Sequence, residues 1–335
     1  MAKIIVDGTD IEFDCADGQS ILAAARSAGF ELPYSCRNGI CGSCKGIIAE
    51  GDYELQSSVD GVLTQQELTE GWSLFCQASP TSDVRIKVDS IQKIDPDATK
   101  TVEAKLYRLE RVTDDVSVLS LRFPAGVRVK FKAGQYLQLQ LESGEVRSYS
   151  MANPSHQTDA AQLHVRHVPG GAFSSYLENH ASVGDFLKLE LPLGSFYLRS
   201  TDNPLLFVVS GTGFAPVKSM IETLIKQGFP DVPIYLYWGG RRKADLYMAD
   251  LVQRWAAKYS NFKFIPVFSE AFEDTDRSGF VHQAVVEDFP SLEGFDVYAC
   301  GVPAMVNAAR RDFVDMCQLP SKSFFCDAFV YSSGH

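Results

Sequence analysis

The fold of the first part of the chain is decided by the stretch Cys36-Arg37-Asn38-Gly39-Ile40-Cys41-Gly42-Ser43-Cys44. Its three cysteines are spaced C-x4-C-x2-C, and a fourth, Cys76, follows after 31 residues. Four thiolates with this spacing can bind a 2Fe-2S cluster. The tight turn brings three thiolates together, and its glycines let backbone N–H groups approach the cluster sulfurs. Because Cys76 returns from a distant segment, cluster binding would also cross-link this part of the chain.

Zinc and disulfides are the alternative interpretations of these cysteines. Structural zinc sites usually pair their ligands as two C-x2-4-C units, whereas Cys76 stands alone. Eight cysteines could form disulfides in an exported protein. Residues 1–7, however, lack the basic start of an export signal, and neither a long apolar core nor a small-residue cleavage site follows. We therefore expect free thiols and a cytoplasmic protein.

Composition limits the range of functions. The 335 residues are enough for three domains, and no apolar run approaches the ~20 residues that span a bilayer. The net charge of -11 disfavours nucleic acid as a partner, because phosphate binding relies on basic patches. Residues 1–90 hold 6 Lys or Arg and 14 Asp or Glu, a net charge of -8. This acidic part is either a solvated face or a docking surface for a basic partner.

The pattern around the cysteines predicts a small α+β domain over residues 1–90. Alternating segments at 3–6 and 11–14 predict strands, and residues 20–28 predict a helix with Ser20 as N-cap and Gly29 as its stop. The whole segment resembles the plant-type ferredoxin family. That resemblance implies a β-grasp fold.

A polar stretch at 91–101 contains proline and lacks hydrophobic periodicity, which predicts a linker. Residues 102–200 then show short alternating segments, at 105–111, 116–123 and 136–141, separated by Gly and Pro. This rhythm predicts an antiparallel β-barrel.

Arg147-Ser148-Tyr149-Ser150 lies within this predicted barrel. Four residues alone could be a chance strand pattern, but in their context they resemble the R-x-Y-S motif of the ferredoxin-NADP reductase superfamily, which binds FAD. The resemblance implies that Arg147 meets the pyrophosphate, Tyr149 stacks on the isoalloxazine and Ser150 lies near its N5. These residue types suit the chemistry, because a guanidinium forks onto phosphate oxygens and a small hydroxyl can hydrogen-bond N5.

A second flavin segment follows. Residues 170–174 predict a Gly-rich turn opening a helix, whose first N–H groups can receive a phosphate. By the same resemblance, Gly171 and Ser174 contact the flavin pyrophosphate, together with Val165 and Arg166. Residues 192–196 resemble the G-x-F segment that ends the barrel in that superfamily.

Residues 203–335 alternate between predicted strands and helices, which indicates a doubly wound α/β domain. The apolar run 205–209 predicts a buried parallel strand, a Gly turn follows, and residues 217–226 predict a helix. The turn resembles the G-T-G-x-x-P motif of the reductase superfamily, with Ser210 where Gly is common. This resemblance implies that Gly211, Thr212, Gly213 and Pro216 bind the nicotinamide coenzyme.

Two further segments resemble the same superfamily. Residues 300–305 match its C-G-x-P-x-M motif, which implies that Cys300 lies beside the nicotinamide and Gly301 against the coenzyme. A structural cysteine is the alternative for Cys300. The C-terminal residues 324–329 form an aromatic strand with one carboxylate. The resemblance implies that Asp327 handles protons near Ser150 and that Phe329 shields the flavin, and a plain core strand is the alternative.

The coenzyme is expected to be NADH, and NADPH stays open. A 2′-phosphate needs an added cationic clamp, which Arg241, Arg242 and Lys243 could supply. NADH delivers two electrons as hydride, whereas a 2Fe-2S cluster accepts one at a time, so a flavin must connect them. We therefore predict electron transfer from NADH through FAD and the cluster to a separate acceptor.

Among single-chain reductases the sequence resembles the CDP-6-deoxy-3,4-glucoseen reductases, notably at 279–285 and 327–329, and equally the reductase components of Rieske aromatic-ring dioxygenases and multicomponent monooxygenases. The resemblance implies an acceptor that is either a pyridoxamine-phosphate sugar dehydrase or an oxygenase. A non-enzymatic iron–sulfur carrier or redox sensor is the alternative, and the intact flavin and nicotinamide motifs argue against it. We expect a monomer with no nucleic-acid or membrane partner.

Overall fold

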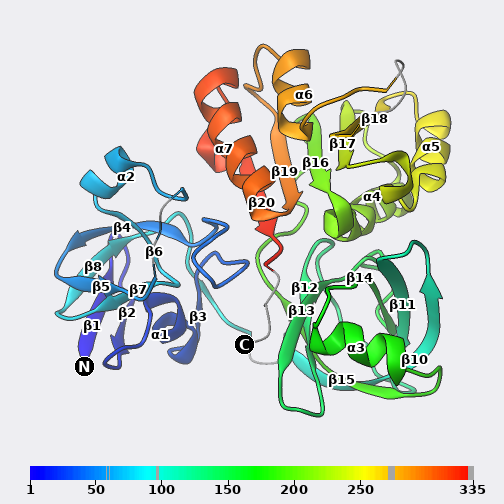
Figure 1. The fold of residues 1–335 in the computed structure, drawn as a ribbon. Helices are drawn as coiled ribbons and strands as arrows, with labels where there is room; N and C mark the ends of the chain where they lie inside the picture. The colour runs from blue at the N-terminus through cyan, green and yellow to red at the C-terminus, as the bar shows by residue number, and fades with distance from the viewer. Residues whose placement is uncertain (58, 60, 96–97, 271–275, 331–335) are drawn as a thin grey trace. The chain divides into compact units, whose positions relative to one another are not determined.

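The computed structural model describes residues 1–57, 59, 61–95, 98–270 and 276–330. The chain forms two compact units, Met1–Ala98 and Thr99–His335 (Figure 1). Pro96 and Asp97 of the predicted linker lie outside the described residues. On either side of them, β9 (Gln92–Lys93) pairs with β3 (Phe30–Glu31), and β10 begins at Lys100.

The first unit has the β-grasp fold predicted for it. Its five-stranded sheet has the order β2-β1-β8-β4-β6, with a parallel β1–β8 pair and antiparallel neighbours. Helix α1 (Ile21–Ser27) contacts β2 and β3, and Ser20 caps it by accepting the N–H of Ala23. The remaining elements are β1 (Ala2–Val6), β2 (Glu12–Cys15), β4 (Lys45–Glu50), β5 (Tyr53–Leu55), α2 (Gln65–Thr69), β6 (Trp72–Leu74), β7 (Ala78–Pro80) and β8 (Val84–Lys87).

The second unit begins with an antiparallel sheet in the order β13-β12-β15-β10-β11-β14. A bridge between Met151 and Leu163 joins its two ends, so the sheet closes into the expected barrel. Inward-facing residues such as Leu119, Leu137 and Leu189 have no exposed surface and form its core. The elements are β10 (Lys100–Arg111), β11 (Val116–Arg122), β12 (Tyr136–Gln140), β13 (Val146–Ser150), β14 (Ala160–Arg166), α3 (Ala172–Asn179) and β15 (Phe186–Leu193).

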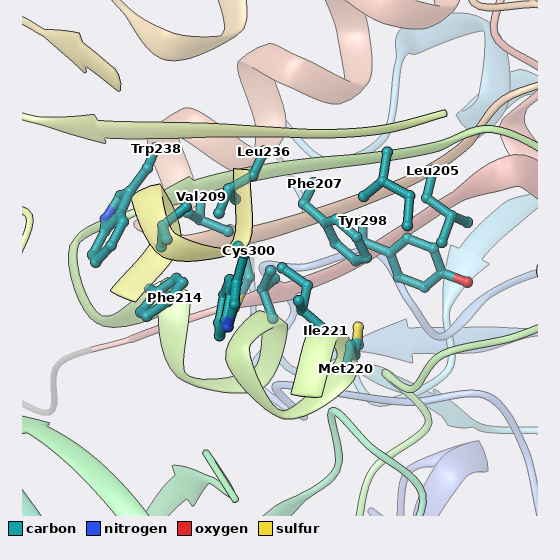
Figure 2. Packing of buried hydrophobic residues seen from close by; sticks show 14 of the residues in the cluster. Leu205, Phe207, Val209, Phe214, Met220, Ile221, Leu236, Trp238, Tyr298 and Cys300 are labelled. Atoms are coloured by element: carbon teal, nitrogen blue, oxygen red, sulfur yellow. The ribbon is translucent and has the colours of Figure 1, made fainter. Parts of the chain in front are cut away.

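The same unit continues into a parallel sheet in the order β18-β17-β16-β19-β20, which is the predicted doubly wound arrangement. Alternate residues of the central strand face opposite sides of the sheet. Figure 2 shows Phe207 and Val209 in a cluster with residues of α4. The other side carries α6 and α7. The elements are β16 (Leu205–Ser210), α4 (Phe214–Gln227), β17 (Ile234–Gly240), α5 (Ala249–Lys258), β18 (Phe262–Phe268), α6 (Val281–Asp288), β19 (Asp296–Gly301), α7 (Pro303–Cys317) and β20 (Phe324–Ala328).

Helix α4 begins at Phe214, three residues before the predicted start at 217. Pro216 therefore lies inside the helix. Because a first-turn residue has no intrahelical partner for its N–H, proline is tolerated there and its fixed φ suits the helix. The earlier start brings the helix directly onto the glycine turn Gly211–Gly213.

Candidate functional site

The four predicted cluster ligands gather from two segments of the first unit. Cys36, Cys41 and Cys44 lie between β3 and β4, and Cys76 lies between β6 and β7. Their sulfurs interact as two pairs, Cys36 with Cys41 and Cys44 with Cys76, and the charge of Cys41 acts on both members of the second pair. Within the described part of the chain, no three His, Cys, Asp or Glu side chains close around a single ion. Two thiol pairs fit a two-iron cluster with two protein ligands for each iron.

Backbone N–H groups of the turn are directed at these sulfurs. Those of Asn38 and Cys41 donate to Sγ of Cys36 at 3.4 and 3.3 Å, and that of Ser43 donates to Sγ of Cys41 at 3.4 Å. The hydrogen bond with Cys36, and then those from Ser43, lower the pKa of Cys41 to about 5 although this thiol is buried. The same contact raises the pKa of Cys36, so within this pair the thiolate, which is the form that binds metal, is favoured at Cys41.

The R-x-Y-S residues lie on β13, at one end of the barrel sheet. The Tyr149 ring is half-buried with its centroid 5.3 Å from that of Phe173, and burial raises the pKa of its phenol. Ser150 is only 6% exposed, and its Oγ has no hydrogen-bond partner in the described residues. A buried hydroxyl without a partner is unfavourable, so this site suits a ligand atom that accepts or donates a hydrogen bond. Arg147 is held by Glu145, with Nη2 and Oε2 3.1 Å apart.

The predicted phosphate turn opens helix α3, with Gly171 immediately before the helix. Gly171 as the N-cap residue offers no side chain to the first N–H groups of α3, and such groups can receive an anion. Ser174 is buried, and its Oγ accepts the N–H of Val168 at 2.8 Å, which closes the turn and leaves the hydroxyl proton available as a donor. The side chain of Val165 is fully buried in the barrel core, so only its backbone can contact a ligand.

Arg166 connects the barrel to the glycine turn. Its Nε donates to Oδ2 of Asp115 at 3.0 Å, and its Nη1 lies 3.2 Å from the point that a Cβ on Gly211 would occupy. Gly213 is packed more closely still, because a Cβ there would lie 2.1 Å from the carbonyl oxygen of Cys300. Thr212 is buried. Glycine at 213 therefore allows the turn after β16 to contact the end of β19 directly.

Cys300 and Asp327 are register partners at the ends of β19 and β20. Cys300 is fully buried, and burial followed by the charge of Asp327 raises the pKa of its thiol. The N–H of Phe329, the residue directly after β20, donates to the carbonyl oxygen of Gly301 at 2.8 Å, so the chain leaves β20 beside the end of β19. Residues from three strand ends therefore meet at the carboxyl edge of the sheet, where α/β folds bind ligands.

Three domain families match consecutive parts of the chain: a 2Fe-2S iron-sulfur cluster binding domain over residues 4–81, an oxidoreductase FAD-binding domain over 103–197 and an oxidoreductase NAD-binding domain over 207–311. Reductase component 1 of terephthalate 1,2-dioxygenase from Comamonas is 41% identical over 98% of both chains. The chain belongs to the ferredoxin-fused FAD- and NAD-binding electron-transfer reductases.

Two further relatives of this reductase extend the comparison. The CDP-6-deoxy-L-threo-D-glycero-4-hexulose-3-dehydrase reductase of Yersinia pseudotuberculosis is 40% identical over 95% of both chains. The crystal structure of the Amycolatopsis cytochrome P450 reductase superposes with a TM-score of 0.77 at 31% identity, covering 99% of this chain and 100% of that one.

The reductase is thus an oxidoreductase that transfers electrons from NADH through FAD and a 2Fe-2S cluster to a separate acceptor. The match to an iron–sulfur family excludes zinc as the expected metal. None of its described helices is long and apolar enough to cross a bilayer.

Sequence reasoning missed a polar joint between the barrel and helix α4 of the reductase. Lys218 is 7% exposed, and its Nζ donates to the carbonyl oxygen of Ala152 at 3.2 Å. Ser219 Oγ donates to the carbonyl oxygen of Asn153 at 2.6 Å, and the N–H of Ser155 donates to Oγ1 of Thr223 at 3.0 Å. The segment held in this way directly follows R-x-Y-S. The available signal was the occurrence of polar residues at 218, 219, 222 and 223 between the apolar residues of this helix.

A second contact across the same boundary joins His164 of β14 to Tyr247. Nδ1 of the imidazole lies 2.8 Å from the phenol oxygen. His164 is buried, and its pKa lies well below the ordinary value because of burial and then the charge of Lys218. The imidazole is therefore neutral at neutral pH.

The cations suggested for a 2′-phosphate clamp follow β17, and the reductase pairs each of them with a carboxylate. Arg241 Nε lies 3.6 Å from Oδ2 of Asp245, which also accepts the backbone N–H groups of Arg241 and Arg242. Two more pairs join Arg242 Nε to Glu270 Oε2 at 3.0 Å and Lys243 Nζ to Asp276 Oδ1 at 2.9 Å. Three cations and three carboxylates leave no formal excess of positive charge for an added phosphate.

Proposed function

We propose that Cys36, Cys41, Cys44 and Cys76 ligate the 2Fe-2S cluster. The supporting observation is that their four sulfurs form two pairs and that the turn's N–H groups are directed at Cys36 and Cys41. We propose equally that the domains are residues 1–90, 102–200 and 203–335, with a linker at 91–101.

For the flavin we propose a site on β13 and α3, formed by Arg147, Tyr149, Ser150, Gly171 and Ser174, with Val165 and Arg166 on the neighbouring strand. The observation that carries this proposal is the buried hydroxyl of Ser150, which has no partner in the described residues. FAD held by these residues would supply a carrier that accepts two electrons as hydride and gives them up singly, as a 2Fe-2S cluster requires. The chain's task is to hold these groups in place and to exclude water.

Each flavin-site residue has a definite part in this proposal. Tyr149 offers a flat ring whose raised pKa keeps the phenol neutral beside the flavin. Ser150 offers one short hydrogen bond in a buried place. Arg147 exchanges its exposed partner Glu145 for phosphate oxygens, which bind a guanidinium in a bidentate manner.

The coenzyme site that we propose is formed by Gly211, Thr212, Gly213, Pro216, Cys300 and Gly301. The Gly213–Cys300 contact supports it, because a coenzyme at the turn after β16 is then also beside the end of β19. Cys300 remains a neutral thiol there, since burial raises its pKa. Asp327 lies next to it in the sheet as a proton-handling group, and Phe329 follows as the residue that shields the flavin.

The acceptor that we propose is an oxygenase component or a pyridoxamine-phosphate sugar dehydrase. Relatives named for a terephthalate dioxygenase and for a hexulose dehydrase support the two classes about equally, at 41% and 40% identity. The reductase is proposed to work in the cytoplasm, and eight cysteines without a disulfide agree with a reducing compartment.

The test separates the flavin from the cluster. Anaerobic NADH should bleach the flavin of the purified reductase. Cys76→Ser should abolish cytochrome c reduction while sparing ferricyanide reduction at the flavin, and equal loss of both would contradict the proposed order. Reconstitution with an oxygenase or a sugar dehydrase, each with NADH, then identifies the acceptor by which one turns over.

A further inference from the structure

Gln77 directly follows the fourth predicted ligand, and its side chain returns to that ligand's sulfur. Gln77 is 7% exposed. Its Nε2 donates to Sγ of Cys76 at 3.5 Å and lies 3.4 Å from the carbonyl oxygen of Arg37. The amide therefore bridges the two chain segments that supply the ligands.

The Arg37 carbonyl determines which end of this amide faces the sulfur, and the Ser57 hydroxyl supports that orientation. The Arg37 carbonyl can only accept a hydrogen bond, so it requires the NH2 end. On the other side, Ser57 Oγ donates to Oε1 of Gln77 at 2.6 Å. Both contacts agree, and together they direct an N–H group of Gln77 at Cys76.

The surroundings leave the Gln77 side chain little room to turn away. A Cβ on Gly39 would lie 2.8 Å from Cγ of Gln77, so the loop packs against the stem of this side chain. Arg37, whose carbonyl receives the amide, has a left-handed backbone with φ 60°. Its guanidinium lies 4.5 Å from the ring centroid of Tyr34, a cation–π contact that anchors this part of the loop.

We propose that Gln77, oriented by Ser57, raises the reduction potential of the cluster by donating a hydrogen bond to the Cys76 sulfur. Reduction adds one electron, and no bond forms or breaks. The added negative charge spreads onto the sulfurs, so a donor stabilises the reduced form more than the oxidised form. The inference rests on the proposed ligation by Cys76. A higher potential makes the cluster a better acceptor of electrons from the flavin and a weaker donor to the partner enzyme.

The test is a redox titration of the full-length reductase, monitored by the EPR signal of the reduced cluster. Gln77→Leu keeps the size of the side chain and removes the donor. It should lower the midpoint potential by about 60 mV, a tenfold change in the one-electron equilibrium constant. Ser57→Ala should lower it by less, because the amide keeps the Arg37 contact but loses the partner of Oε1.

Gln56→Leu is the matched control. The Gln56 amide donates to the carbonyl oxygen of Gly18 at 2.8 Å and to Oγ of Ser79 at 2.7 Å, and it has no recorded contact with a cysteine sulfur among the described residues. The substitution Gln56→Leu makes the same chemical change in the same unit and should leave the midpoint potential of the cluster unchanged. An equal shift in Gln56→Leu would show a general effect of the substitution and would overturn the proposal.

Iron content and the visible spectrum of each variant report whether the cluster is loaded. An unchanged potential in a loaded Gln77→Leu variant overturns the role of Gln77 and leaves the cysteine ligation intact. If Gln77→Leu does not load, Ser57→Ala decides, and an unchanged potential there counts against the proposal. A 2Fe-2S signal that survives in the Cys76→Ser variant of the full-length reductase would instead refute the ligand assignment.

Discussion

Removing the carboxylates that pair with Arg242 and Lys243 should move the reductase toward NADPH. In Rossmann-type sheets the coenzyme ribose is bound near the end of the strand beside the glycine turn, and a cation there accommodates the 2′-phosphate. In this chain that strand is β17. The perturbation is the double substitution Glu270→Gln and Asp276→Asn, which leaves Asp245 to hold the backbone of the turn.

The expected magnitude follows from the exposure of the pairs. The side chains of Arg242 and Lys243 are 62% and 54% exposed, so each pair is worth about 0.2–1 kcal/mol. A 2′-phosphate would regain this energy, which corresponds to about 1.4- to 5-fold in relative affinity for each carboxylate removed. Asp276 is only 9% exposed and should give the larger effect. Together the two changes should raise the NADPH-to-NADH preference roughly tenfold at low salt, and less at high salt.

The assay compares kcat/KM for NADPH and NADH with ferricyanide as acceptor. Dissociation constants of 2′-phospho-AMP and AMP, measured by calorimetry, give the same ratio without turnover. Glu110→Gln is the control, since it removes one exposed carboxylate paired with Arg108 on β10 of the barrel. A preference that stays within twofold of the wild-type value, or that Glu110→Gln moves as far, refutes the placement of the ribose.

Three further predictions concern the flavin side and the joint. Ser150→Ala should slow flavin reduction by NADH about tenfold in stopped-flow experiments with little change in unfolding free energy, because its hydroxyl has no protein partner among the described residues; an unchanged rate contradicts a contact with the flavin. The pKa of His164 is lower in the folded state than the 6.5 of the unfolded chain. Below pH 6.5 the unfolded chain therefore binds a proton that the folded chain does not, and the free energy of unfolding falls by about 1.36 kcal/mol per pH unit, whereas above pH 6.5 it is unaffected by this group. In urea titrations at a series of pH values, the free energy of unfolding of His164→Asn should fall less steeply below about pH 6.5 than that of the wild type. Equal slopes in the two proteins would refute this assignment. Lys218→Met should cost about 1–3 kcal/mol by leaving the Ala152 carbonyl and the Glu222 carboxylate without their donor, whereas Lys226→Met at the end of the same helix should be nearly neutral in the same measurement.

The elements predicted best from sequence are those whose chemistry depends on spacing along the chain. The cysteine spacing predicts the cluster ligands, the resemblance to plant-type ferredoxins implies the β-grasp fold, and the apolar run 205–209 predicts the central parallel strand. The start of α4 was misplaced because Pro216 was treated as preceding the helix. A proline in the first turn gives up no hydrogen bond, so this residue type cannot mark the boundary there.

Other features depend on residues that meet only in the folded chain. The neutralised cations could not be foreseen, because their partners come from beyond β18: Glu270 is 28 residues after Arg242, and Asp276 is 33 residues after Lys243. The same holds for Lys218, whose acceptor is a backbone carbonyl 66 residues earlier. A backbone group carries no sequence signal, so only the packing of α4 on the barrel identifies it.

The departure of Ser210 from the usual glycine is explained by its neighbour across the turn. Its Oγ accepts the N–H of Val302, the N-cap residue of α7, at 3.2 Å and occupies the space beside Gly301. A Cβ on Gly301 would lie 2.1 Å from that Oγ, but also 2.9 Å from the backbone oxygen of Ser210. Restoring glycine at 210 would remove the first clash and not the second, and the φ of 144° at Gly301 would still exclude a side chain. Glycine is therefore required at 301 whichever residue stands at 210, whereas serine is tolerated at 210 because the glycine at 301 leaves room for its hydroxyl.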